Sequence, residues 1–139
     1  MAGRRILVVA NRTLCGRPLL DELHRREREG RVEFYMLVPA SHPHGGWTDY
    51  SAREEAQERL AEITRTLASD GIVATGEVVD ANPVYGVGDV LRRDAFDEII
   101  VSTLPHGVSS WLANNVVRRM RTYGLPVTHV VAAQETADI

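Results

Sequence analysis

The chain has 139 residues, of which 44% are hydrophobic and 25% charged, a composition typical of one compact domain spanning residues 1–139. Its 16 Lys and Arg against 19 Asp and Glu give a formal net charge of -3, which argues against a dedicated nucleic-acid-binding protein. Cys15 is the only cysteine, so an intrachain disulfide is excluded, and the N-terminal apolar run is too short for a signal peptide or a membrane span. We therefore expect a cytoplasmic protein that binds neither nucleic acid nor membrane.

Continuous apolar runs predict the strands. Such runs, which lack the alternation of half-exposed strands, are typical of strands buried on both faces of a parallel sheet. They occur at Ile6–Ala10, Phe34–Val38, Ile99–Val101 and Val127–Ala132, with a weaker run at Ile72–Val79.

Segments with helical periodicity lie between these apolar runs. The expected helices run from Pro18 to Gly30, from Ser51 to Gly71 with Ala56, Leu60, Ile63 and Leu67 on one face, from Val84 to Asp94, and through Trp111, Leu112, Val116 and Met120. The alternating charges of Arg25-Arg26-Glu27-Arg28-Glu29 indicate a solvated helix face. Gly86 and Gly88 indicate loop flexibility and close packing, since a lone GVG is a weak phosphate motif. Alternation of strands and helices predicts an α/β fold, an open, Rossmann-like five-stranded parallel sheet with helices on both faces.

Two segments are candidates for a ligand site. Ligands of open α/β sheets bind beyond the carboxyl ends of the strands, where the strand order reverses. The candidate segments are Ala10-Asn11-Arg12, after the first strand, and Ser102 to Ser110, after the fourth.

The sequence resembles the universal stress protein family over essentially its whole length. The stretches that carry the resemblance are DEIIVST, LPHGVSSW, LANNVVRRMRTYG and LPVTHVV. The resemblance implies strand order 3-2-1-4-5, so that the first and fourth strands are neighbours and bring Asn11 and Ser102 together. It also implies an ATP site after the fourth strand, built on the motif G-x2-G-x9-G-[ST].

That motif is degenerate here. By register with the family, Ser102 and Pro105 replace the first two glycines. If one residue is deleted from the motif, Asn114 and Asn115 replace the final glycine and its Ser/Thr. Asn11 stands where family members often carry an acidic residue. Val38 matches the place where the family's backbone meets the adenine. The resemblance therefore implies the site without its glycines.

The residues themselves predict a polar, anion-tolerant pocket rather than a tight triphosphate cradle. Pro105 has no amide hydrogen to give to a phosphate. Side-chain donors and charges partly replace the lost backbone contacts, and valines remain to line the adenosine end. The candidate nucleotide-binding residues are Val9, Ala10, Asn11, Arg12, Val38, Val101, Ser102, Thr103, Pro105, His106, Gly107, Ser109, Asn114, Asn115 and Val116. We expect ATP or AMP to bind weakly or not at all, with little gain from the triphosphate over AMP or adenosine.

Several residues have both a structural and a functional interpretation. Ser109 and Ser110 suit helix capping better than nucleophilic catalysis, because the closing glycine of a nucleophile elbow is missing. His42 and His44 lack an obvious third metal ligand, so we expect no metal site; Trp47, in the same loop, packs on the core or stacks on a base. Cys15 is either a small apolar filler or a thiol activated by the helix start, and we favour the filler.

Three functions remain open at this point. The leading hypothesis is a non-catalytic small-molecule-binding or signalling module of the stress-protein type, with no catalytic residue. The alternative is an enzyme that hydrolyses a nucleotide or transfers a nucleotidyl group, for which only Asp80 and Asp89 are loosely placed. The third is a structural partner-binding domain whose nucleotide site has lapsed.

The last strand predicts a homodimer. Val127 to Val131 contains no charged residue if His129 is neutral, and the family order places this strand at the sheet edge. An uncharged edge strand is an open template for pairing, which proteins cover or use. In the resembled family the strand often pairs with its twin across a two-fold axis.

Overall fold

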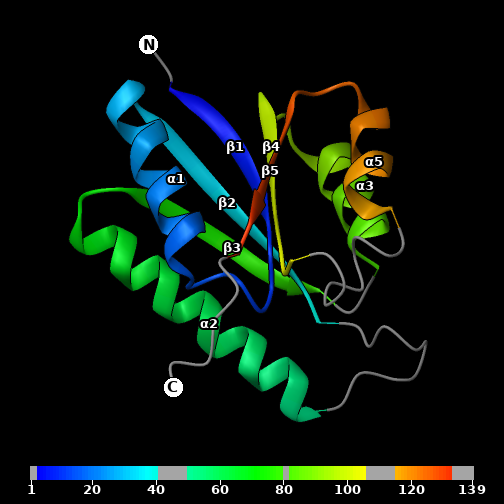
Figure 1. Ribbon diagram of the computed structural model, residues 1–139, viewed down its shortest axis with the longest axis horizontal. Coiled ribbons are helices and arrows are strands. Elements are labelled where there is room, and N and C mark those ends of the chain that lie inside the picture. Colours follow the sequence, from blue (N-terminus) through cyan, green and yellow to red (C-terminus); the bar gives the residue numbers. More distant parts are fainter. Residues whose placement is uncertain (1–2, 41–49, 80–81, 106–114, 133–139) are drawn as a thin grey trace.

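The computed structural model describes residues 3–40, 50–79, 82–105 and 115–132, with side chains from residue 52 onward in the second range (Figure 1). Their elements are β1 (Arg4–Val9), α1 (Arg17–Glu29), β2 (Val32–Pro39), α2 (Tyr50–Ser69), β3 (Val73–Val79), α3 (Pro83–Arg93), β4 (Glu98–Thr103), α5 (Val116–Met120), a 3₁₀ turn (Arg121–Tyr123) and β5 (Val127–Val131). The expected strands are all present.

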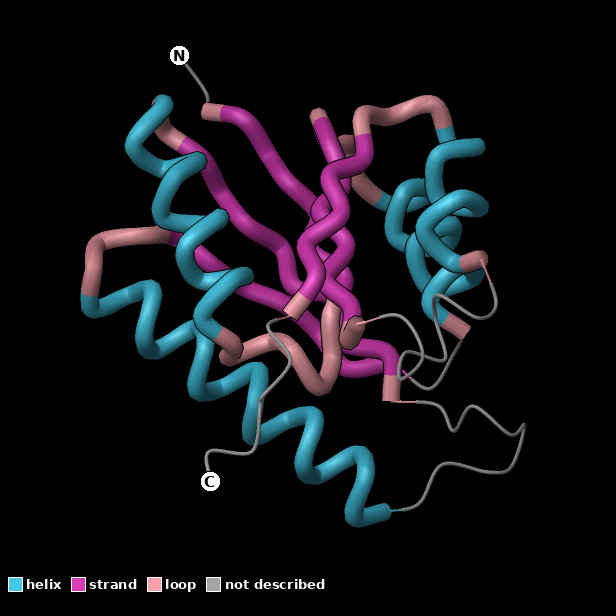
Figure 2. The backbone as a smooth tube through the Cα atoms, in the orientation of Figure 1, coloured by secondary structure: helices cyan, strands magenta, loops and turns pink. Residues whose placement is uncertain are grey.

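The five strands form one parallel sheet in the order β3-β2-β1-β4-β5 (Figure 2). This order confirms the expectation, with β1 and β4 adjacent. In register, Val9 lies beside Leu37 of β2 and Val101 of β4, so the carboxyl ends of the three central strands meet at one edge. We call this the carboxyl edge of the sheet.

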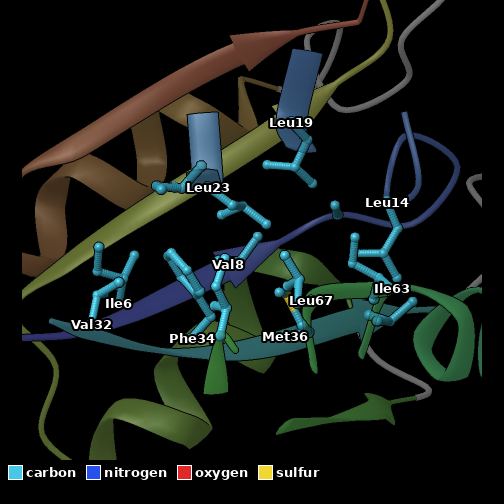
Figure 3. Close-up of a cluster of buried hydrophobic side chains, with 14 of the residues drawn as sticks. Ile6, Val8, Leu14, Leu19, Leu23, Val32, Phe34, Met36, Ile63 and Leu67 are labelled. Carbon is cyan, nitrogen blue, oxygen red and sulfur yellow. The ribbon is translucent and has the colours of Figure 1, made fainter. Parts of the chain in front are cut away.

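Helices cover both faces of the sheet, as its patterning requires. Ile6 and Val8 pack with Leu19 and Leu23 of α1 on one face, and the apolar side chains of α2 extend this cluster (Figure 3). The opposite face packs against α3 and α5 through a second cluster formed by Leu7, Val9, Leu37, Val84, Val87, Val90, Phe96, Ile99, Val101, Val116, Val117 and Met120. Consecutive residues of β1 therefore bury alternate faces, which explains its unbroken apolar run.

The starts of α1 and α3 follow from their first residues. Both helices have proline in the first two positions, where the missing amide hydrogen costs no helical bond. The Asn82 side chain caps α3 by accepting from the Val84 amide. Gly86 and Gly88 lie inside this helix and are buried, so the expected loop flexibility is wrong and close packing is confirmed. A Cβ on Gly88 would lie 2.7 Å from the Tyr123 hydroxyl, which donates to the Val84 carbonyl.

Two sequence interpretations of helices are corrected by the structure. The spacing of Trp111 to Met120 predicted one continuous helix, but Asn115 has φ 56° and ψ 34°, a left-handed conformation that ends or precedes a helix, and α5 begins only after it. Arg26 was placed on a solvated face, but it is 7% exposed and ion-paired beneath α1. In both cases a polar residue takes a structural position that periodicity does not indicate.

Candidate functional site

The carboxyl edge brings two of the predicted segments together. Because Val9, the last residue of β1, pairs with Val101, the residues that follow them, Ala10 and Ser102, lie at the same level of the sheet. The polar side chains of Ser102 and Thr103 are each only 2% exposed. A sheet interior seldom holds hydroxyls at this depth unless they are hydrogen-bonded, and both of these are.

Ser102 is bonded to a residue that the sequence analysis did not select. Its hydroxyl lies 2.6 Å from the Thr13 hydroxyl, and Thr13 is itself 5% exposed. The bond joins the turn after β1 to the end of β4. Nothing in the local sequence distinguishes Thr13 from an exposed turn residue, so only the three-dimensional arrangement identifies it.

Asn11 is held at both ends of its amide group. Its Nδ2 donates to the Pro39 carbonyl at 2.9 Å, and its Oδ1 accepts from Arg59 Nη1 of α2 at 2.9 Å. These bonds fix the turn after β1 to the end of β2 and to α2. Asn11 thus lies toward β2, while Thr13, two residues on, contacts Ser102 of β4. Arg59 was not predicted, because its contact spans 48 residues of sequence.

A third polar contact lies between β4 and β5. The Thr103 hydroxyl is 2.8 Å from His129 Nε2, and a hydroxyl pairs with either form of this nitrogen because it both donates and accepts. His129 was also absent from the predicted set. The chain of polar contacts therefore continues across the carboxyl edge from Pro39 to β5.

The predicted apolar lining divides between the two faces of the sheet. Val9, Val101 and Val116 belong to the cluster beneath α3 and α5, whereas Val38 belongs to the cluster beneath α1 and α2. All four are at most 2% exposed. Their side chains are therefore packed inside the core on opposite faces of the sheet and do not face one common surface.

The remaining described candidates lie around the carboxyl edge. Arg12 is exposed and makes no hydrogen bond or ion pair within the described part of the chain, and Pro105 is half-buried after β4. Asn115 is exposed, and its carbonyl accepts from the Arg119 amide at 3.0 Å, so its backbone is committed to α5. The predicted residues outside the described ranges are His106, Gly107, Ser109 and Asn114, together with His42, His44, Trp47, Asp80 and Ser110.

Cys15 fits the interpretation of an unreactive filler. Burial and the nearby Glu62 carboxylate raise the pKa of its thiol to about 12, which keeps it protonated at neutral pH. The thiol contacts the Arg59 carbonyl at 3.4 Å and packs against the core. It serves packing between the turn after β1 and α2.

No group of three or more His, Cys, Asp or Glu side chains in the described ranges is arranged to hold a metal ion. None of the described helices is long and apolar enough to cross a membrane. A pocket of about 270 Å³ lies at the opposite end of the sheet, between Gly3, Val32 and Val73. It is far from the strand ends where α/β sheets bind ligands.

Comparisons with known proteins identify the fold. No protein-family model matches the sequence, and no curated protein matches it. A solved structure of a universal stress protein from Archaeoglobus fulgidus is 18% identical and covers 91% of this chain and 93% of its own, with a TM-score of 0.60. A structure of the universal stress protein from the same organism in complex with dAMP is 18% identical and covers 94% and 99%, with a TM-score of 0.65.

A third similar structure comes from another organism. A protein of the universal stress protein family from Burkholderia pseudomallei is 14% identical and covers 91% of this chain and 94% of its own, with a TM-score of 0.55. These matches span nearly the whole length of all three chains. Together with the strand order, they show that the chain has the universal stress protein fold.

Proposed function

We propose that this chain is a universal stress protein that binds an adenine nucleotide or a related small molecule at the carboxyl edge without transforming it. The observation that carries the proposal is the buried polar contact between Thr13 and Ser102 at the junction of β1 and β4. It lies where the strand order reverses, the usual ligand position in such sheets. The A. fulgidus structure with dAMP, which shares the fold, supports a nucleotide as the ligand.

The non-catalytic part of the proposal is supported by the chemistry of these side chains. Thr13, Ser102 and Thr103 carry hydroxyls and Asn11 carries an amide, and none of these groups accepts a proton at neutral pH. Asp89, considered above for an enzyme, is exposed on α3 and pairs with Arg92. An enzyme for phosphoryl transfer needs a positioned base or a carboxylate for Mg²⁺ at the reacting group.

Weak ATP binding follows from the loss of phosphate donors. Pro105 supplies no amide, and Ser102 points its hydroxyl to Thr13 instead of to solvent. Each lost charge-assisted hydrogen bond weakens phosphate binding by about 1.5–3 kcal/mol, or about one to two decades in affinity. Two such losses take a micromolar ligand toward the millimolar range.

Calorimetric titration with ATP and AMP, with and without Mg²⁺, tests this function. We expect both nucleotides to bind weakly, ATP no more tightly than AMP, and no phosphate release during prolonged incubation with ATP. Micromolar ATP binding that depends on the β- and γ-phosphates would contradict the proposal and show that the loop after β4 is a working triphosphate site.

The proposed assembly is a homodimer through β5. This strand is at the edge of the sheet, contains no Asp, Glu, Lys or Arg, and leaves Val131 44% exposed. Pairing with a second copy would cover its free hydrogen-bonding groups.

A further inference from the structure

Arg59 is a partly buried arginine, and most of its hydrogen-bonding capacity is unused within the described residues. Its side chain is 30% exposed. Nη1 donates to Asn11, whereas Nη2 lies 3.6 Å from the Glu55 carboxylate, beyond hydrogen-bond distance. A guanidinium has five N–H donors, and within the described residues only one of them is hydrogen-bonded.

Arg26 shows how this protein satisfies an arginine that is purely structural. Its Nε donates to Glu22, its Nη1 pairs with Glu98, and its Nη2 donates to Thr128. All three nitrogens are thus bound, two of them to carboxylates. Among the described residues, Arg59 has instead one amide oxygen at hydrogen-bond distance and one carboxylate at 3.6 Å, so these residues compensate its charge less than that of Arg26.

The surroundings of Arg59 direct this charge toward the carboxyl edge. Asn11, to which it is bonded, lies in the turn after the central strand β1, and both polar atoms of that amide are already occupied. At this point of the edge the group with free donors is therefore the guanidinium. Arg12, the next residue in the chain, adds a second cation without a partner in the described structure.

We propose that Arg59, held in place by Asn11, is the residue that recognises a single phosphate monoester group of the ligand. The inference rests on the proposed function, since it concerns the same carboxyl edge. It also revises one expectation from the sequence: AMP should bind better than adenosine, because Arg59 adds one anion contact that the sequence did not reveal. A charge-assisted contact of this kind gives about a tenfold preference or more. ATP is expected to gain nothing further, because Pro105 supplies no amide to its additional phosphates.

The test compares adenosine, 5′-AMP, 3′-AMP and inorganic phosphate on the full chain by calorimetry. The wild type is expected to bind at least one monophosphate about ten times more tightly than adenosine. Arg59→Gln, which removes the charge, should reduce that ratio to about one with adenosine binding unchanged. Arg65→Gln is the matched control, because Arg65 is exposed on the same helix and makes no contact within the described residues.

A second variant keeps the test valid if Arg59→Gln does not fold. Glu55 is exposed on α2 and partly offsets the Arg59 charge, so Glu55→Gln should raise the preference for the monophosphate about two- to threefold, in the opposite direction. Glu58→Gln, an exposed α2 carboxylate without a contact in the described residues, should leave the preference unchanged.

The outcomes separate this inference from the proposed function. Equal binding of adenosine and both monophosphates by the wild type overturns the role of Arg59 and leaves adenine binding intact. An unchanged ratio in Arg59→Gln or in Glu55→Gln overturns it as well. If adenine compounds fail to bind but inorganic phosphate raises the melting temperature of the wild type and not of Arg59→Gln, the proposed function fails and the anion site stands. If phosphate also has no effect, both are wrong.

Discussion

Both ring nitrogens of His24 are hydrogen-bonded, and their partners determine its protonation state. Nδ1 lies 2.8 Å from the Leu20 carbonyl and Nε2 lies 2.8 Å from the Asp70 carboxylate. Both partners are acceptors, so both nitrogens carry hydrogen when the two bonds form, which is the charged imidazolium. Hydrogen bonding to Asp70, and then to the Leu20 carbonyl, accordingly raises the pKa of His24 above its usual 6.5. The pair joins α1 to the turn between α2 and β3.

This pair predicts a loss of stability as the pH rises above 6.5. Because the folded-state pKa is raised, the stabilising contribution is complete below pH 6.5, the ordinary pKa of the group, and disappears as the pH rises through the folded value. We expect the urea midpoint to fall over this range in the wild type. Asp70→Asn should remove most of that dependence and lower the midpoint mainly on the acidic side.

The matched control for this prediction is Asp21→Asn, since Asp21 is an exposed acid on α1 that makes no contact within the described residues. It should reproduce the wild-type pH profile. Identical profiles in Asp70→Asn and the wild type would show that His24 titrates with no influence on folding.

At the scale of elements, a buried ion-pair network fixes α1 to the sheet. Arg26 joins Glu22 of its own helix to Glu98, the first residue of β4, and to Thr128 of β5. Arg4 of β1 pairs with the same Glu98 carboxylate at 3.2 Å. One helix is thereby connected to three neighbouring strands at the amino end of the sheet, opposite the carboxyl edge.

Two adjacent arginines provide the test of this network. Arg26→Met leaves Glu98 buried with only Arg4, so we expect unfolding free energy to fall by about 3 kcal/mol, the lower part of the range for breaking buried pairs. Arg25→Met removes exposed pairs with Glu22 and Glu29 and should cost less than about 1 kcal/mol. Chemical denaturation of both variants measures the difference, and equal losses would show that burial adds nothing to the Arg26 contacts.

The strands and helices were largely predictable, because a strand buried on both faces of the sheet is apolar at consecutive positions. Ile6 to Val9 alternate between the two core clusters, so every position in the run had to be apolar. The break at Asn115 was not predictable, since the apolar spacing on either side of it is helical. Asparagine is a weaker sequence signal of a left-handed backbone conformation than glycine is.

The candidate site was predictable in its position and not in its contacts. The strand ends follow from the fold, and the sequence correctly brought the ends of β1 and β4 together. The partners Thr13, Arg59 and His129 make contacts spanning 89, 48 and 26 residues of sequence. Hydroxyl, guanidinium and imidazole groups at these positions look like ordinary surface residues until the folded chain places them against Ser102, Asn11 and Thr103.

At the scale of the whole molecule, the two edges of the sheet allow a controlled test of assembly. β5 and β3 are both edge strands, and each exposes one large apolar residue: Val131 is 44% exposed and Val73 is 54% exposed. The proposed dimer uses only β5. Light scattering should give twice the 15.4 kDa chain mass for the wild type at high micromolar concentration.

Lysine on the two edges distinguishes them, because charge on an edge strand opposes pairing. Val131→Lys should convert the dimer to a monomer, and Val73→Lys should leave it intact. The mass of a single chain for the wild type, or dissociation by Val73→Lys alone, would contradict assembly through β5.

The central position of β1 also governs the order in which the protein can form during synthesis. One side of β1 pairs with β2, the next strand to be synthesised. On the other side, Ile6 pairs with Glu98, the first residue of β4, which is synthesised much later. A nascent chain can therefore build β1, β2 and β3 with α1 and α2 while the opposite side of β1 still lacks its neighbour. Only the last third of the chain supplies β4 and β5, and these close both the Thr13–Ser102 junction and the Arg26 network. Residues up to Thr103 must therefore be synthesised before the carboxyl edge can form, so the proposed ligand site and the proposed pairing strand both form late, after β1, β2 and β3.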